Sequence, residues 1–234
     1  MSIILISLVT TILMRFLIIA LPEHLRWQEQ NWLRIDQMQA PLIHPLSKFK
    51  IPTYFKVDDL WLSIFCACLL ISYYFHMRST ENFIWLISYF FVCVLMMLAI
   101  IDCLEQVLPD VVTLSLVWIG LSVQIFPATQ TVGLANAVKG AIIGYLILWI
   151  PSQLFFWFKK QQGIGYGDMK LISAIGSWMG WESLFVTLFF SCLLVIACQL
   201  PALLMGKNIE NTRIPFAPFI VCTSLLGMPN YLNW

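Results

Sequence analysis

The sequence predicts an all-α, polytopic membrane protein with about eight transmembrane helices, and two observations lead to this fold class. Of the 234 residues, 60% are hydrophobic and only 11% are charged, whereas soluble domains carry roughly 25% charged residues. The apolar residues also gather into runs close to the ~20 residues that a helix needs to cross a bilayer. A soluble fold is therefore not expected, and the net charge of +1 gives no reason to expect a nucleic-acid partner.

The apolar runs define the predicted helices in chain order. They are Ser2–Leu21, Leu60–Phe75, Phe83–Ile101, Val111–Phe126, Val138–Phe158, Met169–Trp181, Leu184–Met205 and Ile214–Leu226. Prolines mark irregular positions in three of them: Pro151 predicts a kink in the fifth run, Pro201 interrupts the seventh, and Pro215 lies in the first turn of the eighth. The sixth run is short and less apolar than the others.

Three regions are predicted along the chain. Residues 1–21 form a first transmembrane helix, which we interpret as retained because it has no basic start and no small-residue cleavage site after it. Residues 22–59 form a polar cytoplasmic loop that contains no cysteine, with one short amphipathic helix expected at Glu23–Gln37. Residues 60–234 form a membrane-embedded core.

The loop charges predict the orientation, because cytoplasmic loops carry an excess of lysine and arginine. If alternate loops share a side, one side collects Arg26, Arg34, Lys48, Lys50, Lys56, Lys159, Lys160, Lys170, Lys207 and Arg213, and the other holds Arg78 and Lys139. The basic side is then cytoplasmic, which places Asp102 and Asp168 together at the cytoplasmic edge of the membrane.

Asp102 and Asp168 are the candidate catalytic residues. Asp102 follows the apolar run that ends at Ile101, and Asp168 follows a glycine-rich turn just before another apolar run. A carboxylate at the edge of the hydrocarbon region is costly, so such a residue usually has a function. Two close carboxylates cannot both ionise easily, so they share a proton. The ionised one can activate water while the protonated one polarises a peptide carbonyl.

The residues around these aspartates have weaker assignments. Gly163, Gly165 and Gly167 are expected to shape the turn that carries Asp168, and Lys170 either biases the pair electrostatically or anchors at the lipid headgroups. Asp110 is either a helix N-cap or a substrate contact, and Glu105 is either solvated or a contact for a basic substrate. Gly140 with Gly144, and Gly176 with Gly180, form GxxxG patterns that predict close helix packing.

No metal site is predicted from the sequence. The seven cysteines contain no CxxC pair, and most lie in apolar runs where cysteine acts as a small hydrophobic residue. The three histidines form no HExxH motif.

Three segments together resemble the bacterial type IV prepilin peptidases, a family of GxGD-type aspartic proteases. Residues 163–171, Gly-Ile-Gly-Tyr-Gly-Asp-Met-Lys-Leu, are similar to the GxGD signature. Ile101-Asp102 followed by Leu108-Pro109-Asp110 is similar to the family's other aspartate motif, and residues 214–219 are similar to its IPFGP motif with Ala217 in place of glycine. The segments occur in the family's order, from about residue 98 to the end.

The resemblance implies an inner-membrane aspartic endopeptidase that removes the basic leader of prepilins or pseudopilins at the cytoplasmic face. Asp102 and Asp168 match the family's catalytic aspartates, and proteolysis would need no metal or cofactor. Many members also methylate the new N-terminus with S-adenosylmethionine. The family's cytoplasmic loop, which has been linked to methylation, carries two CxxC pairs, and residues 22–59 have none. S-adenosylmethionine is therefore expected only if methylation is retained.

Two other functions stay open at this point. One is a related enzyme specialised for methylation or for another type of leader. The other is a non-enzymatic membrane scaffold, or a transporter subunit that uses the two acids as a proton or ion relay.

Overall fold

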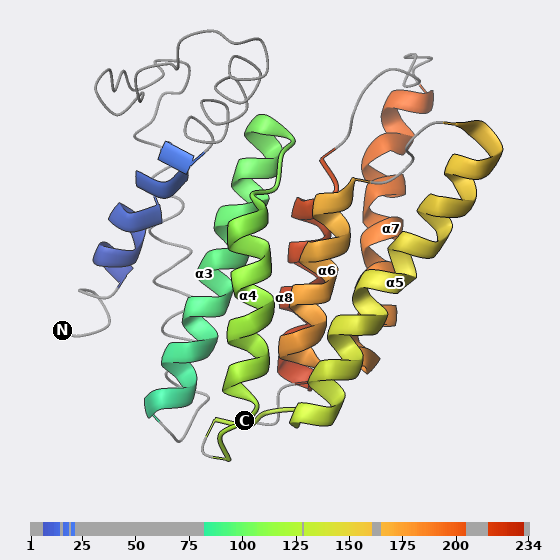
Figure 1. Ribbon diagram of the computed structural model, residues 1–234. Helices are drawn as coiled ribbons and strands as arrows, with labels where there is room; N and C mark the ends of the chain where they lie inside the picture. The colour runs from blue at the N-terminus through green and yellow to red at the C-terminus, as the bar shows by residue number, and fades with distance from the viewer. Residues whose placement is uncertain are drawn as a thin grey trace, which may run out of the picture. The chain divides into compact units, whose positions relative to one another are not determined.

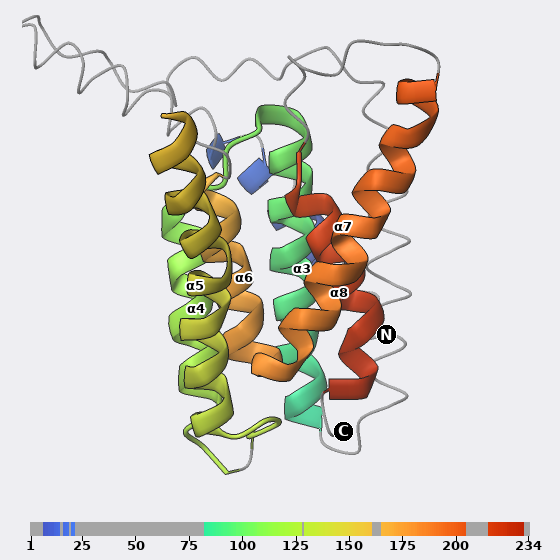
Figure 2. The same cartoon turned by 90° about the vertical axis from the view of Figure 1, so that its right-hand side faces the viewer.

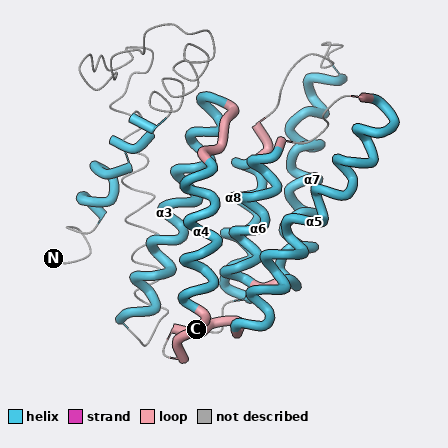
Figure 3. Tube along the Cα trace, viewed as in Figure 1, coloured by secondary structure: helices cyan, strands magenta, loops and turns pink. Residues whose placement is uncertain are grey.

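The computed structural model describes residues 7–14, 16–18, 20–21, 82–127, 129–160, 165–204 and 215–231. These residues are helical apart from short loops and turns, and no strand occurs among them (Figure 3). The prediction of an all-α membrane fold is confirmed for this part. The second apolar run, the polar segment 22–59 and its predicted short helix lie outside the described residues, so the number of spans stays a prediction.

The chain divides into two compact units, Met1–Met97 and Leu98–Trp234. In the first unit, the short apolar helix Ser7–Ile18 lies against the part of α3 (Asn82–Glu105) that belongs to this unit. The hydroxyls of Thr10 and Tyr89 share a hydrogen bond of 2.7 Å, and Tyr89 is buried. A polar group in an apolar environment needs such a partner.

The second unit contains the last turns of α3 and the five helices that follow. These are α4 (Asp110–Val123), α5 (Leu134–Lys159), α6 (Tyr166–Met179), α7 (Trp181–Leu204) and α8 (Ala217–Tyr231). Their order agrees with the predicted apolar runs, and α5 continues through Pro151. Figures 1 and 2 show α6 running beside α4 and α5, and α7 beside α8.

Helix α6 is the centre of this unit, because it packs against α4, α5, α7 and α8. Apart from Lys170, which is partly exposed, every residue from Met169 to Met179 is buried. This position explains why α6 is short and less apolar than its neighbours: a helix surrounded by other helices needs small residues for close approach more than it needs oily ones for lipid.

Small residues and polar contacts hold α6 to its neighbours. A Cβ atom added to Gly144 of α5 would lie 2.8 Å from the carbonyl oxygen of Ile172, and Gly140 and Gly176 leave even less room between their backbones. The Ser173 hydroxyl donates to the carbonyl of Ala141 at 2.8 Å. The predicted helix packing at these three glycines is confirmed, whereas Gly180 ends α6 at a φ of 79°, a value that favours glycine.

The outer faces of α5 and α7 are strongly apolar. Leu86–Glu105 of α3, Leu134–Lys159 and Trp181–Leu200 are long and apolar enough to cross a membrane, and α4 and α8 are shorter apolar helices. Ile142, Phe189 and Ile196 are more than half exposed. Contiguous apolar surface of this kind is unfavourable in water and suits contact with lipid, where helices satisfy their own backbone groups. The structure is therefore that of a multi-pass membrane protein.

Candidate active site

Asp102 lies on the buried face of the last turn of α3. It follows Leu95 and Leu98 at helical spacing, and its side chain is only 6% exposed. Its Oδ2 atom accepts a hydrogen bond of 3.1 Å from the backbone N–H of Ala217, the first residue of α8. The helix then ends at Gln106, which has a φ of 54° and donates its N–H to the Asp102 carbonyl at 2.9 Å. The carboxylate is thus fixed between two helix ends.

Asp168 lies in the first turn of α6, outside the three candidate spans, and its side chain is partly buried. Burial, together with the negative charge of Asp102, raises the pKa of the Asp168 carboxyl to about 7. The electrostatic contribution means that the two carboxyl groups lie within interaction range, although 66 residues separate them in the chain. Both aspartates thus lie in the unit Leu98–Trp234, at the end of α3 and at the start of α6.

The glycines before Asp168 leave room for its carboxylate and for a neighbouring loop. Gly165 is the N-cap of α6, and a Cβ atom at this position would lie 3.3 Å from Oδ2 of Asp168. A Cβ atom at Gly167 would lie 2.8 Å from Cβ of Leu108, a buried residue in the loop after α3. Neither glycine has a positive φ, so close approach rather than backbone freedom explains them. Gly163 lies outside the described residues.

We expect Gly167→Ala to slow the proposed cleavage without removing the protein from the membrane. The added methyl group pushes the start of α6 away from Leu108, and a displacement of about 1 Å at a reacting group costs on the order of 10²-fold in rate. Cleavage of a substrate of the family that the motifs resemble, by membranes with equal amounts of the protein, measures the loss. Leu108→Gly in the same chain should restore part of the rate; if it restores none, the contact is not the cause.

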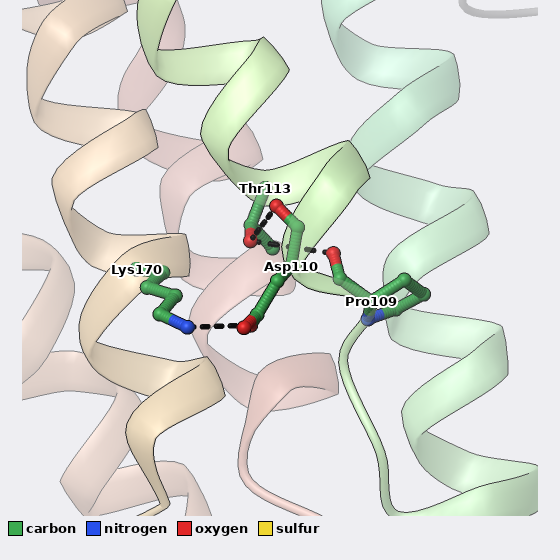
Figure 4. A network of polar contacts seen from close by, with 4 residues as sticks. All are labelled: Pro109, Asp110, Thr113 and Lys170. Carbon is green, nitrogen blue, oxygen red and sulfur yellow. Dashed lines mark hydrogen bonds and ion pairs between the residues drawn. The ribbon is translucent and has the colours of Figure 1, made fainter. Parts of the chain in front are cut away.

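Lys170 and Asp110 form an ion pair with each other. Nζ of Lys170 lies 2.6 Å from Oδ1 of Asp110, and the Asp110 side chain is 60% exposed (Figure 4). Asp110 is the first residue of α4 rather than its N-cap, which is Pro109; the N-cap interpretation is wrong because the Asp110 side chain turns to Lys170. The Thr113 hydroxyl lies 3.3 Å from the carbonyl oxygen of Pro109 and 3.2 Å from that of Asp110, and it can donate to either.

Glu105 is the last residue of α3 and is partly buried. Its predicted contact with a basic substrate, and that of Asp110, stay predictions. Among the described residues, no group of three or more histidine, cysteine, aspartate or glutamate side chains is arranged to hold a metal ion.

Sequence reasoning missed one member of the site, the backbone N–H of Ala217. The residue was noted only because it replaces a glycine in the segment 214–219. The same segment contains one indication of this role. Pro215 and Pro218 have no N–H to donate, so few backbone donors are present near Ala217. Backbone donors are difficult to locate from sequence, since every residue except proline has one.

These features define a class of protein: a helical membrane protein with one buried and one partly buried aspartate at the ends of different helices. Residues 89–200 match the model of the type IV leader peptidase family, which confirms the resemblance predicted from the motifs. The matched region contains both Asp102 and Asp168.

Curated relatives agree with this match. The chain is 38% identical over 142 residues to a prepilin leader peptidase/N-methyltransferase of Burkholderia pseudomallei (strain 1026b), covering 59% of this chain and 45% of the relative. A protein of the same name from Aeromonas hydrophila is 34% identical over 135 residues, which cover 58% of this chain and 46% of that relative. Another from Escherichia coli (strain K12) is 34% identical over 147 residues, which cover 62% of this chain and 63% of that relative.

The chain thus spans about half the length of the first two relatives. No solved structure gives a significant match.

Proposed function

We propose that this protein is an aspartic endopeptidase that cleaves the leader from type IV prepilins or pseudopilins. The observation that carries the proposal is the position of the two aspartates in the same unit of the chain, Asp102 in the last turn of α3 and Asp168 in the first turn of α6, where the charge of Asp102 contributes to raising the pKa of Asp168. The family match over residues 89–200 and the names of the relatives, prepilin leader peptidase/N-methyltransferase, support the reaction and the substrate class.

The proposed chemistry is attack of water on the scissile carbonyl. One ionised aspartate takes a proton from water as the water oxygen bonds to the carbonyl carbon, and the other aspartate donates its proton to the carbonyl oxygen. The first aspartate then passes its proton to the leaving nitrogen. The carbon–nitrogen bond breaks, and the second aspartate recovers its proton from the collapsing hydroxyl group. Both residues return to their starting states, and no metal or cofactor takes part.

The proposed substrate has a basic leader and an apolar stem. Its stem can lie in the bilayer beside the apolar helices, while its leader remains in water at the face where the aspartates lie. Glu105 and Asp110 are acidic residues near this face and are proposed contacts for the leader, Asp110 together with its partner Lys170. The distribution of lysine and arginine supports a cytoplasmic position for this face in the inner membrane.

Methylation of the new N-terminus is proposed only as an additional activity that needs S-adenosylmethionine. The relatives' names include N-methyltransferase. The loop that lacks the cysteine pairs, residues 22–59, lies outside the described residues.

The test is incubation of a model prepilin with membranes that contain the full chain, with and without S-adenosylmethionine, followed by mass analysis of the product's N-terminus. Membranes with an Asp102→Asn/Asp168→Asn chain at equal level serve as the blank. The proposal requires a product shortened by the leader in the first membranes only. Equal cleavage in both would overturn it, and an added methyl mass would establish the second activity.

The pH dependence of cleavage follows from the raised pKa of Asp168, about 7. If cleavage needs one protonated and one ionised aspartate, the rate falls as the pH rises through 7, because the second proton is then lost. Above this value we expect about a tenfold decrease per pH unit. Initial rates of prepilin cleavage between pH 5 and pH 9 measure the effect; a rate that stays constant up to pH 9 would contradict it.

A further inference from the structure

We infer that the backbone N–H of Ala217 determines which of the two aspartates is ionised. It holds Asp102 as the ionised base and leaves Asp168 as the protonated acid. Ala217 is thus a positioning residue that acts through Asp102. The inference rests on the proposed function and extends it, since a shared proton alone does not say which aspartate carries it.

The first step is the contact itself. The Ala217 N–H donates to Oδ2 of Asp102 at 3.1 Å, and Ala217 is fully buried. A donor directed at a carboxylate favours the ionised form. The bond also lies at the N-terminus of α8, where the helix dipole favours negative charge. The hydrogen bond and the dipole of α8 offset the effect of the α3 dipole, whose negative end lies at the last turn of α3, where Asp102 is located.

The second step is that α8 presents this N–H alone at its first three positions. Pro218 has no N–H, and the N–H of Phe219 is used by the carbonyl of Phe216 at 3.1 Å. The Ala217 N–H has no acceptor within α8, because a helix N–H bonds to the carbonyl four residues earlier and Ala217 is the first residue of the helix. The segment therefore directs one amide at the carboxylate.

The third step is the comparison with Asp168. Asp168 lies in the first turn of α6 and gains from the dipole of that helix. In the described part of the chain, however, no hydrogen-bond donor to its carboxylate is present. Burial raises the pKa of Asp168, but it does not distinguish the two aspartates, because Asp102 is itself only 6% exposed. A hydrogen bond to a charged group is stronger than the effect of a helix dipole at a nearby position. The Ala217 N–H is therefore the feature that favours the ionised form at Asp102 rather than at Asp168.

Other charges near the site do not reverse this order. The titratable groups concerned are Asp168 and Lys170 of α6, Asp110 of α4, Cys222 of α8, and Cys103 and Glu105 of α3. Lys170 is engaged by Asp110, and Cys103 interacts with both Asp102 and Cys222. None of these interactions supplies Asp102 with a cation.

With these roles, Asp102 takes the proton from water as the water oxygen bonds to the scissile carbon. Asp168 gives its proton to the carbonyl oxygen. Asp102 then passes its proton to the leaving nitrogen as the carbon–nitrogen bond breaks, and Asp168 recovers a proton from the collapsing hydroxyl group.

The test replaces Ala217 by lactic acid, which turns the N–H into an ester oxygen and keeps the methyl side chain. We expect the acidic limb of the pH–rate profile for prepilin cleavage to move up by about one pH unit, with the basic limb unchanged. The matched control is the corresponding ester at Ile220, whose N–H donates to the Phe216 carbonyl at 3.3 Å. This control and Ala217→Gly, which keeps the N–H, should leave the acidic limb in place.

A second measurement covers the case in which the Ala217 ester does not cleave at any pH. In an Asp168→Asn chain, the infrared band of protonated Asp102, obtained by difference from the Asp102→Asn/Asp168→Asn chain, gives its titration midpoint directly. The Ala217 ester should raise this midpoint by about one pH unit. An unmoved midpoint, or an equal shift with the Ile220 ester, overturns the inference. Unimpaired cleavage by the two single aspartate variants would instead overturn the proposed function.

Discussion

Asp102→Asn and Asp168→Asn should each abolish prepilin cleavage while the amount of protein in the membrane stays the same. An amide can neither take a proton from water nor give one to the carbonyl oxygen, and general acid–base catalysis contributes about 10²–10⁴-fold for each group. Asparagine has nearly the same shape as aspartate and can still accept the Ala217 N–H. Accumulation of uncut prepilin and the protein level, measured in the same membranes, test this.

The aspartate-to-glutamate variants separate the peptidase from a proton or ion relay. A relay keeps part of its function when a carboxyl group is displaced by one methylene group. A pair that activates water should lose cleavage in Asp102→Glu and in Asp168→Glu, because the reacting atoms must be aligned. If uncut prepilin accumulated in only one of the two asparagine variants, the paired mechanism would be wrong.

Gly176→Val should prevent α5 and α6 from packing and remove most of the folded protein. At this position the backbones of Gly140 and Gly176 are so close that even a Cβ atom would collide with the carbonyl group of the other helix. Overpacking a core costs about 1–3 kcal/mol where side chains can yield; here backbone would have to move, so we expect roughly 3 kcal/mol or more. The midpoint of thermal unfolding in detergent, and the amount of protein in the membrane, measure the effect.

Ala197→Val on α7 is the matched control, because this residue is exposed in the middle of an apolar helix. This variant also replaces a small residue by valine, but its side chain faces lipid. It should change neither the unfolding midpoint nor the amount of protein in the membrane. Gly176→Ala should have an effect on both measurements that lies between those of Gly176→Val and Ala197→Val. If Gly176→Val were as stable as Ala197→Val, close contact between α5 and α6 would not be needed for the fold.

The sequence was sufficient to predict the helices from α3 to α8, and it singles out Asp102 and Asp168 as candidates, because both inferences depend on strong local signals. Long apolar runs identify α3, α5 and α7, and a carboxylate beside such a run is conspicuous. The burial of α6 on all sides could not be predicted, since its serines, alanines and glycines fit both a central helix and a weak span. Gly180 shows a related ambiguity: its spacing from Gly176 indicates helix packing, but its backbone conformation ends the helix.

The details of the site depended on contacts between distant parts of the chain. Asp110 could be placed at the start of α4 from its sequence, yet its pairing with Lys170 follows from how α4 packs on α6. The donor to Asp102 comes from a residue 115 positions later, through a backbone atom that the side-chain pattern does not distinguish. Its flanking prolines were visible, but their effect needed the position of α8.

The enclosure of α6 by its neighbours has a consequence for the response to lipid composition. When acyl chains become longer or shorter, the mismatch acts on the apolar surfaces of α5 and α7, while α6, which carries Asp168 in its first turn, contacts mainly protein. The position of Asp168 should therefore depend little on the thickness of the bilayer. Reconstitution into bilayers of different acyl length should alter the tilt of the peripheral helices before it alters turnover.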